Sequence, residues 1–144
     1  MNSTDNNQGK GVIFDPIRQK YISAQPEEIV RQYFVDLLHK KYGYPYLRMS
    51  NEYSIRVGKL PKRCDTVVLD NKLNPLMIIE YKATHIKLSQ EIIEQAFRYN
   101  AALGVPYIII TNGKQMAVYK VGYKGSPTIT LPDIPYYSDL IKHP

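Results

Sequence analysis

The amino-acid sequence predicts an α/β fold in which helices flank a mixed β-sheet. Two stretches of the chain repeat apolar residues at helical spacing, and short runs of apolar and β-branched residues lie between and after them. The expected order is helix, three strands, helix, two strands (α-β-β-β-α-β-β). Because helix and strand signals alternate along the chain, the elements should pack as layers around one core.

The first predicted helix begins at Pro26 and spans about four turns. Proline is favoured in the first helical turn, and Glu27 and Glu28 suit the positive end of the helix dipole. Gly43 can end the helix. The apolar stripe that should face the core comprises Ile29, Val30, Tyr33, Phe34, Leu37 and Leu38.

Three strands are expected next. Residues 52–57 alternate weakly, residues 65–70 are rich in β-branched side chains, and residues 76–82 are nearly continuously apolar, which is typical of a buried strand. The intervening NKLNP segment has the composition of a turn. An antiparallel pairing around this turn would oppose Leu69 to Leu76, Val67 to Ile78 and Asp65 to Glu80.

The second half of the chain predicts a helix over about 88–103, a strand over 106–111, a turn at Asn112-Gly113 and a returning strand over 116–121. Four prolines fall in the last twenty residues, so this segment is expected to wrap the surface without joining the sheet. The expected organisation is a polar N-terminal tail (1–20), one domain (21–124) and a Pro-rich C-terminal extension (125–144).

Composition bounds the class of protein. A chain of 144 residues and 16.6 kDa predicts one domain, and 44% hydrophobic with 22% charged residues can form a packed core. Nineteen Lys and Arg against thirteen Asp and Glu give a net charge of +6, which favours an anionic partner such as nucleic acid. The single cysteine, Cys64, excludes an internal disulfide and any multi-cysteine metal site.

The sequence also indicates where the protein resides. Every apolar stretch is too short to span a membrane, and the polar N-terminus lacks the apolar segment of a signal peptide. We therefore expect a soluble, cytoplasmic protein with no membrane partner.

Two acids and a lysine converge on one face of the predicted hairpin. Directly opposed residues share a face, so Asp65 would stand beside Glu80, and Lys82 lies two residues further along the same face. Two close carboxylates repel each other, and Mg²⁺, which prefers oxygen ligands, would relieve the repulsion. A cation lowers the pKa of a bound water, and a lysine can orient that water or stabilise charge on a phosphoryl group. The alternative is a structural ion cluster at the sheet edge.

The segment Arg63-Cys64-Asp65, followed after fourteen residues by Glu80-Tyr81-Lys82, resembles the metal-binding core of the PD-(D/E)xK nuclease superfamily, whose core is restriction-endonuclease-like. The nearer resemblance is to the N-terminal nuclease domain of type I restriction enzyme R subunits. Residues 26–32 resemble that family's first-helix motif, residues 94–100 its Q-x-x-x-Y helix, and residues 105–113 the strand and turn that follow.

This resemblance implies a metal-dependent DNA endonuclease that hydrolyses phosphodiester bonds, with Mg²⁺ as the cofactor and Mn²⁺ as a substitute. Asp65 and Glu80 would be metal ligands, and the backbone carbonyl of Tyr81 would be a third. Glu28, or alternatively Glu27, would be the first-helix acid that helps to bind the metal. Lys82 would position the attacking water.

Further residues are implied to touch DNA. Gln95 and Tyr99, four residues apart on one helix face, would contact DNA or orient the catalytic groups, with ordinary helix packing as the alternative. Lys59, Lys62 and Arg63 directly precede Asp65, so we expect a loop there that touches the phosphate backbone. A solvated basic surface is the alternative for these three residues.

Three functions remain open at this point. The first is a DNA endonuclease domain of restriction type, and the second is a nuclease-like DNA-binding or assembly module that does not cut by itself. The third is a small interaction protein whose acid cluster is structural. Type I R subunits continue into a helicase motor, whereas this chain has no ATP-binding loop, so either a stand-alone domain or a piece of a longer protein is expected. Cutting both strands would need a homodimer, a second binding event or partner subunits of a restriction system.

Overall fold

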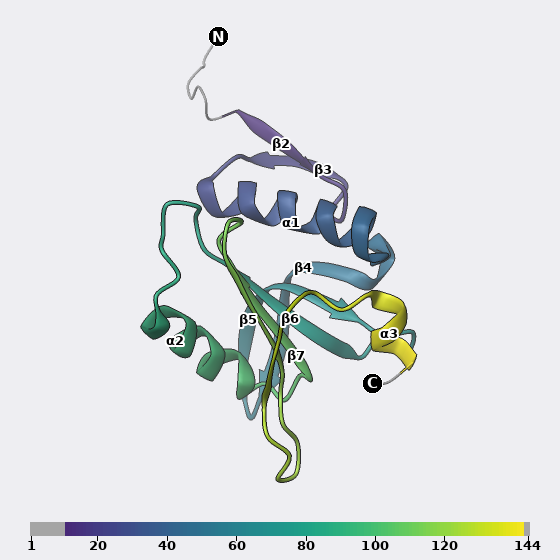
Figure 1. The fold of residues 1–144 in the computed structure, drawn as a ribbon. Helices are drawn as coiled ribbons and strands as arrows, with labels where there is room; N and C mark the ends of the chain where they lie inside the picture. The colour runs from purple at the N-terminus through teal and green to yellow at the C-terminus, as the bar shows by residue number, and fades with distance from the viewer. Residues whose placement is uncertain (1–10, 143–144) are drawn as a thin grey trace.

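A six-stranded mixed β-sheet forms the centre of this structure, a computed structural model that describes residues 11–142 (Figure 1). Its strands lie in the order β4-β5-β6-β7-β8-β9, and a separate hairpin pairs β2 with β3. The elements in chain order are β2 (Val12–Asp15), β3 (Lys20–Ser23), α1 (Pro26–Tyr42), the 3-10 helix η1 (Tyr46–Arg48), β4 (Met49–Val57), β5 (Leu60–Leu69), β6 (Pro75–Tyr81), α2 (Gln90–Ala101), β7 (Tyr107–Thr111), β8 (Met116–Lys120), β9 (Ile129–Leu131) and α3 (Tyr137–Lys142).

The predicted α/β fold with a mixed sheet is confirmed, and the predicted order of one helix, three strands, a second helix and two strands is found from α1 to β8, with β2 and β3 before it and β9 and α3 after it. β6 and β7 pair in parallel, while the other strand pairs are antiparallel. A parallel pair needs a crossover connection, and α2 supplies it. Within residues 11–142, none of the helices is both long enough and apolar enough to cross a membrane.

Different helices cover the two faces of the sheet. Buried side chains of α1 and α3 pack with Ile79 and Ile109 on one face, which we call the α1 face. Ala96 of α2 packs with Ile108 on the other, the α2 face. Neighbouring residues of β6 and β7 are therefore buried on opposite faces, which explains the nearly continuous apolar runs in the sequence.

The predicted β5–β6 register is confirmed at its centre and wrong at its turn. Val67 lies opposite Ile78, as expected. An irregularity just before Leu69 then shifts the pairing by one residue, so that Leu69 lies opposite Pro75 and not opposite Leu76. Leu76 consequently packs on the α1 face, although alternation would have placed it with Ile78.

β5 begins at Leu60, earlier than the predicted start at residue 65. β4 and β5 form one long hairpin closed by the two-residue turn Gly58-Lys59, in which Gly58 adopts a φ of +64° that glycine tolerates. Lys62 and Arg63 therefore lie within a strand, and the expectation of a loop is wrong for them. Lys59 alone of the three lies in the turn.

The expectation that the last twenty residues stay outside the sheet is also wrong. β9 pairs with β8 at the sheet edge. Pro127 precedes β9 and Pro132 follows it, so neither proline removes a donor from the strand. Beyond β9, Ile134, Tyr137 and Leu140 are buried against the α1 face. The predicted C-terminal extension thus completes the core of the domain.

The predicted polar tail over 1–20 contains ordered structure in its second half, and its residues 1–10 lie outside the described residues. β2 and β3 pair around a turn that the buried Asp15 organises by accepting the backbone N–H groups of Ile17 and Arg18. Burial opposes ionisation of Asp15, but hydrogen bonds from Arg18, Asn51 and Ile17 outweigh it and lower the pKa of this carboxyl. This hairpin packs beside α1 (Figure 1).

Leu140 provides a test of whether α3 belongs to the core. Its side chain is 1% exposed, so Leu140→Ala should lower the free energy of unfolding by about 2–5 kcal/mol through lost burial and the cavity left behind. Leu47→Ala is the matched control, because Leu47 is 86% exposed and its truncation should change that free energy by less than about 0.5 kcal/mol. Denaturant unfolding measures both, and equally small losses would contradict the packing of α3 on the sheet.

Candidate active site

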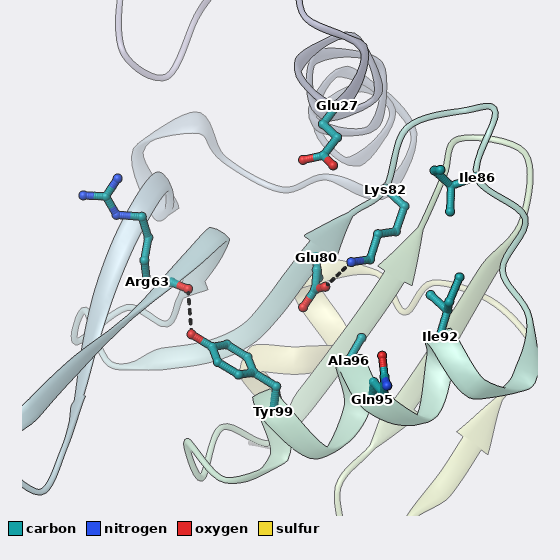
Figure 2. A pocket seen from close by; sticks show the side chains of 9 residues that line it. All are labelled: Glu27, Arg63, Glu80, Lys82, Ile86, Ile92, Gln95, Ala96 and Tyr99. Carbon is teal, nitrogen blue, oxygen red and sulfur yellow. Dashed lines mark hydrogen bonds and ion pairs between the residues drawn. The ribbon is translucent and has the colours of Figure 1, made fainter.

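An open cavity of about 560 Å³ lies between the start of α1, the end of β6 and one side of α2 (Figure 2). Its lining residues come from distant parts of the sequence: Glu27, Arg63, Glu80, Lys82, Ile86, Ile92, Gln95, Ala96 and Tyr99. The structure therefore brings together four separately predicted groups of site residues. Asp65 is not one of the lining residues, and its carboxylate turns toward the backbone of β6 instead.

Glu80 presents a carboxylate whose two oxygens have different partners. Because strand residues two apart share a face, Glu80 and Lys82 point into the same space at the end of β6. The Lys82 ammonium Nζ lies 3.1 Å from Oε2 of Glu80 (Figure 2). The amide Nδ2 of Asn100, near the end of α2, donates to Oε1 at 2.8 Å.

Asp65 reaches the end of β6 from the neighbouring strand β5. Its Oδ2 accepts the backbone N–H of Tyr81 at 2.9 Å. Burial raises the pKa of Asp65 and the charge of Glu80 raises it further, while the Tyr81 bond and Arg31 act in the opposite direction. Burial and the charges of the same two carboxylates raise the pKa of the Cys64 thiol to about 11. Asp65 and Glu80 thus stand close enough to repel each other.

The carboxylate oxygens of Asp65 and Glu80 fit a hard divalent cation, because such ions prefer oxygen ligands and the charge of Glu80 raises the pKa of Asp65. The carbonyl of Tyr81, the last residue of β6, lies next to Glu80 in the chain and adds a neutral oxygen. Within residues 11–142, no three Asp, Glu, His or Cys side chains gather as a complete ligand set would. An ion held here would need backbone, water or phosphate oxygens as its remaining ligands.

The two acids at the start of α1 have different surroundings. Glu28 is engaged in an ion network, where Oε2 accepts Nε2 of Gln32 at 2.8 Å and lies 3.1 Å from both Arg18 and Arg31. Glu27 lines the cavity and faces Glu80 across it (Figure 2). The structure therefore brings Glu27, and not Glu28, to the cavity wall, and metal binding by either acid stays a prediction.

A buried guanidinium holds the backbone at Asp65. Arg31 of α1 donates Nη1 to the Asp65 carbonyl and Nη2 to Oε2 of Glu52 at 2.7 Å. The other oxygen of Glu52 lies 3.2 Å from Nη1 of Arg63. Burial opposes ionisation of Glu52, but the hydrogen bond and charge of Arg31 and the charge of Arg63 outweigh it and lower its pKa. The network joins α1 to β4 and β5.

The side chains of β4 and β5 switch from one face of the sheet to the other at the position where Glu52 lies opposite Asp65. Glu52 has a φ of +58°, in the left-handed region that residues with a side chain seldom adopt, and the ladder is interrupted at these two residues. Met49 packs on the α1 face, whereas Tyr53, an even number of residues along the same strand, packs on the α2 face. Regular alternation would keep Met49 and Tyr53 on one face, so the left-handed backbone of Glu52 must twist the strand between them. Asp65 lies opposite this twist.

Three of the five remaining predicted contact residues, Arg63, Gln95 and Tyr99, line the cavity. Tyr99 is 42% exposed, and its hydroxyl donates to the Arg63 carbonyl at 3.5 Å, a long and weak hydrogen bond. The Lys62 ammonium lies 4.9 Å from the centre of the Tyr99 ring. Gln95 lines the cavity from the same side of α2. Lys62 thus adjoins a lining residue without lining the cavity itself, and Lys59 lies at the hairpin tip.

Three residues that hold the acids were missed in the sequence, namely Arg31, Glu52 and Asn100. A signal was available for two of them. Asn100 follows Ala96 by four residues on the packed side of α2, and Arg31 lies within the apolar part of the first helix, so each is a polar side chain at a core position that needs a partner. The sequence gives no such signal for Glu52, because residue type does not favour a left-handed glutamate inside a strand.

The chain resembles known proteins at the level of family and fold. The family described as type I restriction enzyme R protein N terminus (HSDR_N) matches residues 26–135. A solved fragment described as an HsdR subunit of a type I restriction enzyme from Vibrio vulnificus YJ016 is similar, with a TM-score of 0.60 and 20% identity over 82% of this chain and 25% of that one. This chain therefore spans about a quarter of that solved chain. No curated protein matches it.

Removing the buried guanidinium should destabilise the fold. Arg31→Met leaves Glu52, Glu28 and the Asp65 carbonyl without their cation, so the free energy of unfolding should fall by at least about 2 kcal/mol. Arg56→Met is the matched control, since Arg56 is exposed and should change stability by less than about 0.5 kcal/mol. Denaturant unfolding compares the two variants. Losses of equal size would show that Arg31 is not a special support of the site.

Removing the charge of Asp65 should stabilise the protein at neutral pH. A raised folded-state pKa means that ionisation of Asp65 opposes folding, and Asp65→Asn removes that charge while keeping an oxygen for the Tyr81 N–H. The gain should be fully present above the folded-state pKa and should fade as the pH falls toward the unfolded value of about 3.9. Thermal unfolding from pH 7.5 down to pH 4.5 measures it. A lower melting temperature for Asp65→Asn at pH 7.5 would contradict this assignment.

Proposed function

Because the chain belongs to the family of type I restriction enzyme R protein N termini, we propose that it is a metal-dependent nuclease domain that hydrolyses phosphodiester bonds in DNA. The observation that carries the proposal is the meeting of Asp65, Glu80 and Lys82 at the end of β6, beside an open cavity. Two close carboxylates that repel each other, next to an ammonium, suit cation-assisted attack on phosphate.

Each residue of this group has a role in the proposed reaction. Asp65, Glu80 and the Tyr81 carbonyl would hold Mg²⁺, or Mn²⁺ in its place, and the ion would supply an activated water and offset the charge of the phosphate. Lys82 lies within the cavity and would orient the water and stabilise negative charge on the phosphoryl oxygens. Glu27 lies across the cavity from Glu80, where it could accept a hydrogen bond from a water.

The surface around the cavity suits the approach of a polyanion. Arg63 of β5 lines the cavity while its guanidinium pairs with Glu52, and the neighbouring Lys62 ammonium lies over the exposed Tyr99 ring. These cations would contact phosphates and position the duplex without reading its sequence. Gln95 would contact DNA from α2, and Lys59 at the hairpin tip would reach a more distant phosphate. The net charge of +6 supports such an encounter.

The wider setting is part of the proposal. We place the domain in the cytoplasm, within a restriction system whose other subunits would supply activities beyond these residues. One active site cuts one strand at a time, so a double-strand break would require a second copy of the chain or a second binding event. The described residues contain one such group of two acids and a lysine.

DNA cleavage tests the proposal. The wild-type chain should nick supercoiled DNA with Mg²⁺ or Mn²⁺ and stop when a chelator is added. Asp65→Ala and Lys82→Ala should each lower the rate by at least about 10²-fold, because each removes a charge that the proposed reaction needs. Lys72→Ala, an exposed lysine in the turn between β5 and β6, is the matched control and should cut like the wild type.

Three other outcomes would argue against the proposal. Nicking that survives both site substitutions would indicate a contaminating nuclease. DNA binding without cutting by the wild-type chain would favour a non-cleaving DNA-binding or assembly module. A chain that neither binds nor cuts DNA would favour a structural role for the acid cluster.

A further inference from the structure

Asn100 is a buried polar residue that contacts one of the acids directly. It is 1% exposed, and its amide Nδ2 donates to the Ala96 carbonyl and to Oε1 of Glu80, each at 2.8 Å. Both partners are acceptors, so the amide nitrogen, and not the amide oxygen, must face them. The hydrogen bond to the Ala96 carbonyl lies within α2 and fixes the orientation of the amide that donates to Glu80. Asn100 therefore holds the Glu80 carboxylate in one orientation.

The hydrogen bond from Asn100 leaves the charge of Glu80 in place. An amide is neutral, so it orients a carboxylate without neutralising it, whereas the Lys82 ammonium at 3.1 Å from Oε2 both orients and neutralises. The Glu80 side chain remains 22% exposed to the cavity. A carboxylate that is fixed on its buried side and open on the other is suited to bind a cation.

Asn100 also connects two walls of the cavity. Its hydrogen bond is the polar link from α2, which carries Gln95 and Tyr99, to β6, which carries Glu80. Loss of this bond would free the Glu80 carboxylate to rotate toward Lys82 or away from Asp65. The other contacts of α2 with the sheet are apolar, as between Ala96 and Ile108, or run from Tyr99 to β5. None of them is a hydrogen bond to Glu80, so they cannot replace the orienting bond.

We infer that Asn100 is a positioning residue that aims the Glu80 carboxylate at a divalent cation. The inference rests on the proposed function and adds a residue to it that touches neither the ion nor DNA. Hydrogen-bond partners of metal ligands typically contribute 10–100-fold to metal affinity, so replacement of Asn100 should weaken cation binding by about that factor.

Calorimetric titration of the protein with Mn²⁺, without DNA, tests the inference. Asn100→Leu removes the amide at similar volume, and Asn100→Ala removes it with less strain if the leucine variant does not fold. Asn112→Leu is the matched control, because Asn112 is 2% exposed and donates to the Ile86 carbonyl at 2.8 Å without a hydrogen bond to Glu80. A folded Asn100 variant should bind Mn²⁺ about 10–100-fold more weakly, and the control should bind within about twofold of the wild type.

A purely structural role for Asn100 would give a different result. The melting temperature would fall for both Asn100 and Asn112 variants, while their Mn²⁺ affinities would match the wild type, and this outcome would overturn the inference and leave the proposed function intact. Absence of Mn²⁺ binding by the wild-type chain would overturn both. In the nicking assay, a rate that is low at limiting Mn²⁺ and recovers at saturating Mn²⁺ would support the inference, because that pattern reports on the ion and not on folding.

Discussion

The site depends on the hydrogen bonds that the buried guanidinium of Arg31 donates to the Asp65 carbonyl and to Glu52. This guanidinium reaches them from α1, at the point where the side chains of β4 and β5 switch faces of the sheet. A left-handed glutamate in a strand is unfavourable by about 1–3 kcal/mol, and it persists because Arg31 and Arg63 hold its side chain. The twist that results places Asp65 at the end of β6, next to Glu80.

The surroundings of Asp65 also explain why a negative charge on its carboxyl is unfavourable. Burial and the neighbouring Glu80 both raise the pKa of Asp65, so its ionisation opposes folding. Lys82 compensates one oxygen of Glu80, and Asn100 orients the other without adding charge. The fold therefore keeps two acids close together at some expense of stability, and carboxyl groups with perturbed pKa values are common at functional sites.

Much of the fold could be predicted from the sequence because its strongest signals are local. Apolar periodicity identified the two main helices, and the pairing of Val67 with Ile78 at the centre of the β5–β6 hairpin was predicted correctly, which indicated that Asp65 lies near the end of β6. β9 was missed because a three-residue edge strand between prolines has almost no pattern of its own. Asn100 and Arg31 were missed because their partners are distant in sequence, at Glu80 and Asp65, and only the tertiary structure brings them together.

The proposed function requires that Asp65 and Glu80 share one divalent cation at the end of β6. A crystal structure of the wild-type chain grown with Mn²⁺, with data collected where manganese scatters anomalously, tests this claim most directly. We expect an anomalous peak between the two carboxylates, within ordinary coordination distance of an oxygen from each. A fully occupied peak elsewhere, or an empty position between the carboxylates at saturating Mn²⁺, would contradict it.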